Sequence, residues 1–120
     1  MTSEPSCPRP SAELRPTRPR PRRYPLIASV ELTDIQSAAK LRQVITDLSV
    51  FGCHISTQKM WPIGTQVRIR IAHDDATFDA FARIVYARPH LGMGIVFTLV
   101  EPDYQWILER WIGDLRESMR

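Results

Sequence analysis

The stretch QVRIRIA, residues 66–72, constrains the fold more than any other part of this sequence. Its apolar residues Val67, Ile69 and Ile71 alternate with two arginines. In an extended chain this alternation puts the apolar side chains on one face and the cationic ones on the other. A strand of this kind needs other strands to cover its apolar face. The chain has 120 residues, which suits one domain with a core and is too short for two of ordinary size.

Five further short runs rich in Val, Ile, Leu and Phe predict the partner strands. They span residues 26–32, 41–48, 53–57, 77–88 and 93–100. The turn-forming stretches WPIGT, HDDAT and RPHLG separate some of them. We therefore predict a mainly-β fold, a small antiparallel barrel or sandwich of six strands. Asp74, Asp75 and Asp79 are expected together at a solvated hairpin tip.

The last segment changes its period and predicts a C-terminal amphipathic helix over about residues 102–118. Its apolar residues recur every three or four positions, which places them on one face of a helix. They are Tyr104, Ile107, Leu108, Trp111, Ile112, Leu115 and Met119. Pro102 and Asp103 suit the first turn. We expect this face to pack on the barrel, and Trp106, which lies off it, to be available for an outside contact.

The basic character of the chain is confined to its beginning. Residues 1–23 carry six Arg against two Glu, a net charge of +4, whereas the remainder has a net charge of −1. Six of the ten prolines lie in the same segment, and it has too little apolar surface to offset the entropy of ordering. We predict a disordered Pro/Arg-rich tail over residues 1–20 and a folded domain over residues 21–120.

Several classes of protein are excluded by what the sequence lacks. No apolar run has the length of a signal peptide core or of a membrane span. The two cysteines, Cys7 in the tail and Cys53 in an apolar stretch, favour a reducing compartment, with Cys53 as a small core residue. The three histidines and Cys53 do not follow zinc-ligand spacing, and no nucleophile or phosphate-loop motif is present. We expect no metal, no cofactor and no catalysis.

The stretch DLSVFG, residues 47–52, is the candidate for binding chemistry. Asp47 offers two acceptor oxygens, Ser49 a hydroxyl, and Gly52 a backbone able to adopt a positive φ. Such a set can accept hydrogen bonds from the donor edge of a guanine, while the nearby arginines bind its acceptors and phosphate. The alternative is a turn in which these side chains only satisfy their own backbone.

In its order of features the sequence resembles the PilZ domain family from about Arg18 to Leu115. The likeness rests on the D-x-S-x-x-G motif, on an arginine cluster ahead of the first strand, and on positions in the later strands. The residues concerned are Arg18, Arg22, Arg23, Asp47, Ser49, Gly52, Gly64, Gly92, Gly94 and Phe97. The resemblance implies a six-stranded β-barrel with a C-terminal helix that binds the bacterial second messenger cyclic di-GMP.

The resemblance also implies which residues bind the nucleotide. The D-x-S-x-x-G residues Asp47, Ser49 and Gly52 would form one side, and an R-x-x-x-R motif before the first strand the other. The literal motif here is Arg18 and Arg22, whereas Arg23 directly precedes Tyr24 and Pro19 stands four residues before it. We name Arg18, Arg22 and Arg23 as ligand-binding candidates.

Two functions are compatible with these residues. The first is a cytoplasmic cyclic di-GMP receptor that signals through a protein partner, since the chain has no catalytic or DNA-binding appendage. The second is a PilZ-like interaction module that does not bind nucleotide. A tail that generically binds polyanions is a further possibility, but the near-neutral body of the domain disfavours nucleic acid as a ligand.

Overall fold

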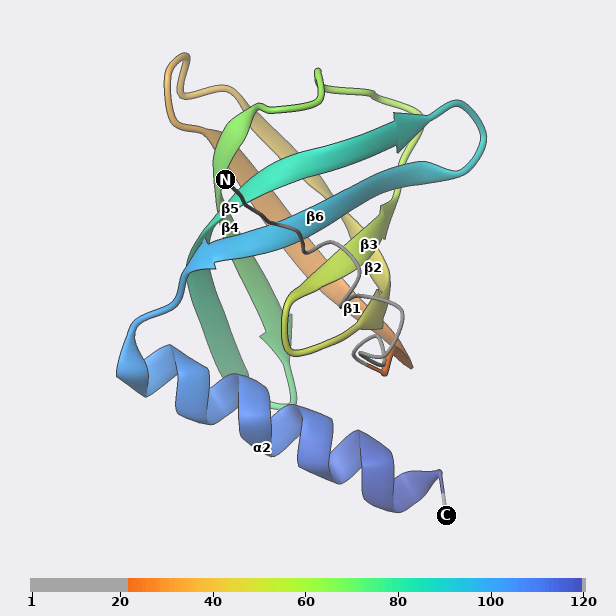
Figure 1. The fold of residues 1–120 in the computed structure, drawn as a ribbon, viewed down its shortest axis with the longest axis vertical. Coiled ribbons are helices and arrows are strands. Elements are labelled where there is room, and N and C mark those ends of the chain that lie inside the picture. Colours follow the sequence, from red (N-terminus) through yellow and green to blue (C-terminus); the bar gives the residue numbers. More distant parts are fainter. Residues whose placement is uncertain (1–21, 120) are drawn as a thin grey trace, which may run out of the picture.

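The computed structural model describes residues 22–119, and these form a closed six-stranded β-barrel with one helix (Figure 1). The strands are β1 (Tyr24–Asp34), β2 (Lys40–Leu48), β3 (Gly52–Ser56), β4 (Gln66–His73), β5 (Ala76–Arg88) and β6 (Gly92–Leu99). The helix is α2 (Pro102–Ser118). The predicted barrel and helix are confirmed, with strand ends shifted by one or two residues. The expected disordered tail, 1–20, lies outside the described residues.

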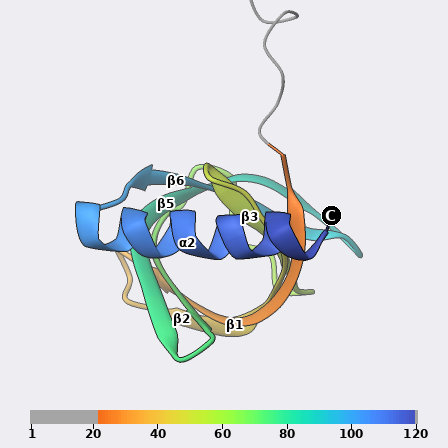
Figure 2. The ribbon, with the colours of Figure 1, turned by 90° about the horizontal axis from the view of Figure 1, so that it is seen from below.

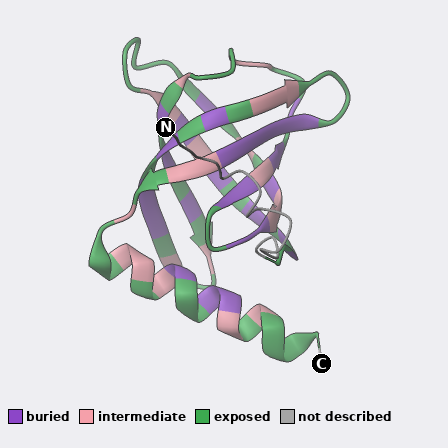
Figure 3. Ribbon diagram, in the orientation of Figure 1, coloured by how far each residue is buried: buried purple, intermediate pink, exposed green. Residues whose placement is uncertain are grey.

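All neighbouring strands are antiparallel, in the order β1-β2-β3-β6-β5-β4, and β1 closes the barrel by pairing with β4. Along β1 and β4 alternate residues point inward, so that buried and more exposed positions alternate, whereas the first four residues of β6 are all buried (Figure 3). In β4 the predicted inward residues Val67, Ile69 and Ile71 are completely buried. Cys53 is also fully buried, which confirms it as a core residue.

The helix α2 lies across one end of the barrel (Figure 2). Leu108, Trp111 and Ile112 are buried there, and the Trp111 ring meets His73 edge-on at 5.3 Å. The predicted apolar face is confirmed for these residues, but Met119 at its end is exposed because it lies just beyond the helix and the barrel. Among the described residues, no helix combines the length and apolar character needed to cross a membrane.

One expectation about the β4–β5 hairpin is wrong. Asp74 and Asp75 do form an exposed turn, and both have the positive φ that a tight two-residue hairpin requires. Asp79, however, lies within β5 and is buried. Arg70 Nε donates to its Oδ2 at 3.1 Å, and Arg68 Nε is 3.4 Å from Oδ1. Asp79 is therefore not part of the exposed turn. Arg68 and Arg70 hold its carboxylate against the outer wall of the barrel.

Candidate functional site

The strand β2 departs from regular alternation just before it turns into β3. Ile45 and Leu48 are both completely buried although they are three residues apart. The pairing of β2 with β3 slips between Ile45 and Asp47. A β-bulge of this kind adds one residue to a strand and changes the direction of its side chains. It allows Asp47 to stay on the outer face of the barrel between two core positions.

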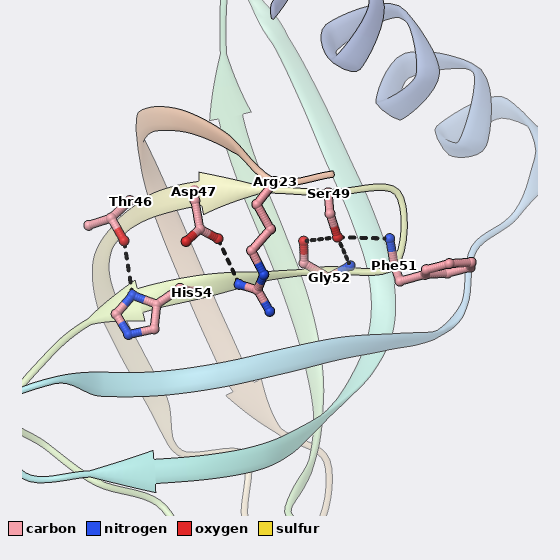
Figure 4. A network of polar contacts seen from close by, with 7 residues as sticks. All are labelled: Arg23, Thr46, Asp47, Ser49, Phe51, Gly52 and His54. Atoms are coloured by element: carbon pink, nitrogen blue, oxygen red, sulfur yellow. Dashed lines mark hydrogen bonds and ion pairs between the residues drawn. The ribbon is translucent and has the colours of Figure 1, made fainter. Parts of the chain in front are cut away.

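Arg23 reaches Asp47 from the segment that leads into β1. The register of β1 and β2 sets Pro25 opposite Asp47, and Arg23 Nη1 donates to Asp47 Oδ1 at 3.0 Å (Figure 4). The side chains are 50% and 28% exposed. An ion pair this accessible to water contributes no more than about 1 kcal/mol. An incoming ligand could therefore replace either partner at little cost.

Arg22 stands beside this pair but is engaged differently. Its guanidinium lies over the ring of Tyr24, 6.0 Å from the ring centroid. The Tyr24 side chain is itself buried, so this contact anchors Arg22 at the start of β1. Two arginines thus stand at the edge of the barrel, one on a carboxylate and one on an aromatic ring.

Ser49 holds the β2–β3 turn together. Its hydroxyl oxygen accepts from the backbone N–H of Phe51 and of Gly52, both at 3.2 Å, and it donates to the Gly52 carbonyl at 3.3 Å. The residue is buried. Its hydrogen-bonding capacity is used within the turn, as the turn interpretation of the motif predicts. In Figure 4 the Phe51 side chain projects outward from this turn.

Gly52 is required for a reason other than the one expected. Its φ is not positive, so the turn does not use the conformational freedom that a glycine offers at this position. A Cβ at this position would overlap the backbone carbonyl of Ile95 in β6. The absence of a side chain lets β3 and β6 approach closely below the turn, and Phe97 N–H donates to the Phe51 carbonyl at 2.8 Å.

A hollow of about 270 Å³ lies over this part of the barrel wall. Val85 and Val96 give it an apolar lining, and Arg23 stands at its edge. The remaining lining residues are Ser49, Phe51, Gly52 and Ile95. An apolar hollow beside a cation and a carboxylate suits a planar, polar-edged group such as a purine base.

Sequence reasoning missed an aromatic group next to Asp47. His54 lies opposite Asp47 in the strand register and its Nδ1 is 2.9 Å from Thr46 Oγ1 (Figure 4). The His54 ring stacks on the Tyr86 ring, with 6.0 Å between the ring centroids. The Arg88 guanidinium lies over the Tyr86 ring, 5.7 Å from its centroid. The alternation of CHIS already places His54 on the outer face, but its neighbours depend on the strand order.

Cys53 offers no reactivity at this site. Burial raises the pKa of its thiol well above the usual range, and the negative charge of Asp47 adds to the effect. The thiol is therefore held in its protonated, unreactive form. Within residues 22–119 no group of three or more His, Cys, Asp or Glu side chains could hold a metal ion.

The structure brings most of the predicted site residues together. Arg22, Arg23, Asp47, Ser49 and Gly52 all lie where β1 begins and β2 turns into β3. The remaining candidate, Arg18, lies outside the described residues. Of the five, Arg22, Arg23 and Asp47 have accessible polar groups, whereas Ser49 and Gly52 shape the turn.

Comparisons with known proteins agree with this architecture. The family model for the PilZ domain matches residues 16–114. No curated protein sequence matches the chain.

Solved structures share the fold at low sequence identity. The PilZ domain of CeSA from a cellulose-synthesizing bacterium has a TM-score of 0.63 and 24% identity, over 79% of this chain and 98% of that one. The PilZ domain with c-di-GMP of YcgR from Escherichia coli has a TM-score of 0.64 and 19% identity, over 87% and 95%. The Bacillus subtilis inhibitor of motility MotI/DgrA has a TM-score of 0.68 and 13% identity, over 87% of this chain but 54% of that one.

Proposed function

Because the chain belongs to the PilZ domain family, we propose that it is a cyclic di-GMP receptor that acts through a protein partner. The nucleotide would lie on the outer face of the barrel, over the β2–β3 turn. Arg22, Arg23 and Arg18 would bind it from one side and Asp47 from the other. The domain would act as a regulatory binding module and not as an enzyme, and it would need no cofactor besides this ligand.

The contact of Arg23 with Asp47 at 3.0 Å is the observation that carries this proposal. It joins the arginine segment to the D-x-S-x-x-G motif, although the two residues are 24 positions apart. The carboxylate of Asp47 can accept from N1–H and N2–H of a guanine, which only donate. Arg23 can then turn to the guanine O6 and N7 or to a phosphate, both of which arginine binds with two parallel hydrogen bonds.

In this proposal Ser49 and Gly52 act indirectly. The buried hydroxyl of Ser49 is bound to the turn, so its role is to hold Asp47 and the backbone of the turn in position. Gly52 allows β3 and β6 to pack closely enough to form the floor of the hollow. The motif would then contain one contact residue and two positioning residues.

The alternative, a PilZ-like module that does not bind nucleotide, is favoured by a different observation. Phe51, Leu99 and Trp106 are strongly exposed, and a groove of about 450 Å³ lies between the β2–β3 turn and α2. An apolar surface of this kind can serve a protein partner. In that case the contact of Arg23 with Asp47 would be a structural ion pair only.

Isothermal titration of the full chain with cyclic di-GMP separates the two functions. We expect saturable binding by the wild type, and a loss of at least about tenfold in affinity, on the order of 1.4 kcal/mol, in each of Arg22→Ala/Arg23→Ala and Asp47→Asn. The matched control is Asp114→Asn, which removes an exposed carboxylate from α2 and should bind normally. Cyclic di-AMP should bind more weakly because adenine lacks the guanine donor edge.

The opposite result would also be informative. If the wild type gives no heat and no change in melting temperature at millimolar cyclic di-GMP, the receptor function is wrong, since any real site stabilises the folded state in excess ligand. Circular dichroism of each variant establishes that a loss of binding is not a loss of folding.

A further inference from the structure

A second concave surface lies on the outer wall of β1, β2 and β4. It is a shallow groove of about 730 Å³. Its lining shares no residue with that of the hollow beside Arg23 and Asp47. The groove is therefore distinct from the candidate nucleotide site.

Three successive rows of outward side chains cross this wall, because the strand register sets them side by side, and the third row borders the groove with only Lys40 in its lining. The first row, Val44, Ser29 and Ala72, is small or apolar and forms the floor. The second row is Arg42, Glu31, Arg70 and Asp79, and the third is Lys40, Thr33, Arg68 and Phe81. We call Lys40, Arg42, Arg68 and Arg70, with the carboxylates of Glu31 and Asp79, the basic face.

Cations outnumber carboxylates on the basic face by four to two. Arg42 Nε donates to Glu31 Oε2 at 3.1 Å, and Lys40 Nζ lies 3.9 Å from Oε1. These contacts lower the pKa of Glu31, chiefly through the hydrogen bond from Arg42. The basic face therefore keeps a net charge of +2 although the folded body as a whole is close to neutral.

The carboxylates of the basic face are less exposed than the arginines that they contact. The Asp79 side chain is 6% exposed and that of Glu31 is 21% exposed, whereas more than half of the Arg42, Arg68 and Arg70 side chains is accessible. Each arginine contacts its carboxylate through Nε. The terminal nitrogens of the guanidinium can then donate to an acceptor arriving from solvent. The two carboxylates thus orient a set of cations that they do not fully neutralise.

The spacing of the cations fits an extended acidic chain. Arg68 and Arg70, like Lys40 and Arg42, are two residues apart on one strand, so their positions repeat at about 7 Å. Side chains at alternate positions of an extended peptide repeat at the same interval. The small side chains of Ser29 and Ala72 let such a peptide approach the wall.

We propose that the basic face binds an extended segment of a partner protein with Asp or Glu at alternate positions. The inference rests on the proposed function only in that the chain acts through a protein partner. Nucleic acid fits less well, because the carboxylate of Glu31 lines the groove and repels a continuous line of phosphates.

Fluorescence anisotropy of the full chain tests this inference with defined probes. The probe is a labelled nine-residue peptide of alternating Glu and Thr. Its controls are the same peptide with Gln in place of Glu, and a labelled thymidine oligonucleotide. We expect the Glu peptide to bind at least about tenfold more tightly than the Gln peptide at low salt. Arg42→Gln/Arg70→Gln should remove that difference, and Arg110→Gln, on α2, should leave it unchanged.

Two results would overturn the proposal. One is equal binding of the Glu and Gln peptides by the wild type, and the other is tighter binding of the oligonucleotide than of the Glu peptide. Titration of Arg42→Gln/Arg70→Gln with cyclic di-GMP keeps the two hypotheses separate. Normal nucleotide binding by this variant would also establish that it is folded.

Discussion

The two outer walls of the barrel use a carboxylate and arginine in different ways. Asp79, on β5, is almost inaccessible and is held by two arginines of the neighbouring strand. Asp47, at the end of β2, is more exposed and is held by one arginine from outside the barrel. The first arrangement stabilises the wall and orients cations, whereas the second leaves both partners able to exchange. Accessibility, more than the presence of an ion pair, separates a structural carboxylate from a binding one.

Removing the buried carboxylate should have the largest effect on stability. Asp79→Asn leaves Arg68 and Arg70 without their counter-ion in a site where water has little access to the replacement amide. We expect the free energy of unfolding to fall by about 1–3 kcal/mol, measured by urea denaturation. The double variant Asp79→Asn/Arg70→Gln should lose less than the sum of its single variants. A cost no larger than that of Asp47→Asn would remove the distinction between the two walls.

A second substitution tests whether Ser49 positions the turn. Ser49→Ala removes the acceptor for two backbone N–H groups, those of Phe51 and Gly52. We expect a loss of about 1–2 kcal/mol in the free energy of unfolding. Ser56→Ala, the same change at an exposed position of β3, is the matched control and should have little effect. A neutral Ser49→Ala with impaired nucleotide binding would instead make Ser49 a direct contact.

The fold could be read from the sequence because it depends on local alternation. The apolar periodicity of QVRIRIA, and of the runs similar to it, predicts which residues face the core whatever their partners are. The helix is predicted for the same reason by its repeat of three and four residues. Both properties belong to short segments and need no knowledge of the strand order.

The parts of the site that the sequence does not predict depend on how the strands pair. The bulge before Asp47 arises from the pairing of β2 with β3, and the need for Gly52 arises from the carbonyl of Ile95 in β6. The sequence predicts Asp79 at the hairpin tip because it is close to Asp74 in sequence, but the structure places it within β5. Its burial depends on the arginines of β4 and on the first turn of α2, where Tyr104 lines the same small cavity.

The exposed ion pair of Arg23 and Asp47 should contribute little to the free energy of unfolding. For Arg23→Gln and Asp47→Asn, alone or combined, we expect losses below about 1 kcal/mol in the free energy of unfolding, with a coupling energy within the same limit. The same variants should show the large losses in cyclic di-GMP affinity described above. A coupling energy above about 2 kcal/mol would make the pair structural, in contrast to the typical exposed pair, and would favour the non-binding module.

Replacement of Glu31 should have the smallest effect on stability, and that effect should depend on pH. Its pKa is lowered from the usual value of 4.5 in the folded protein, so the unfolded chain binds its proton first as the pH falls. The contribution of Glu31 to stability is therefore complete above about pH 4.5 and is lost as the pH falls through the lower folded-state pKa. Urea midpoints between pH 3 and 5 should fall less steeply for Glu31→Gln than for the wild type. The control Glu109→Gln removes a carboxylate from the exposed side of α2, and the comparison of the two slopes isolates the arginine contact. Parallel curves for Glu31→Gln and the wild type would mean that Arg42 does not hold this carboxylate in solution, and the cations of the basic face would then lack the orientation that peptide binding requires.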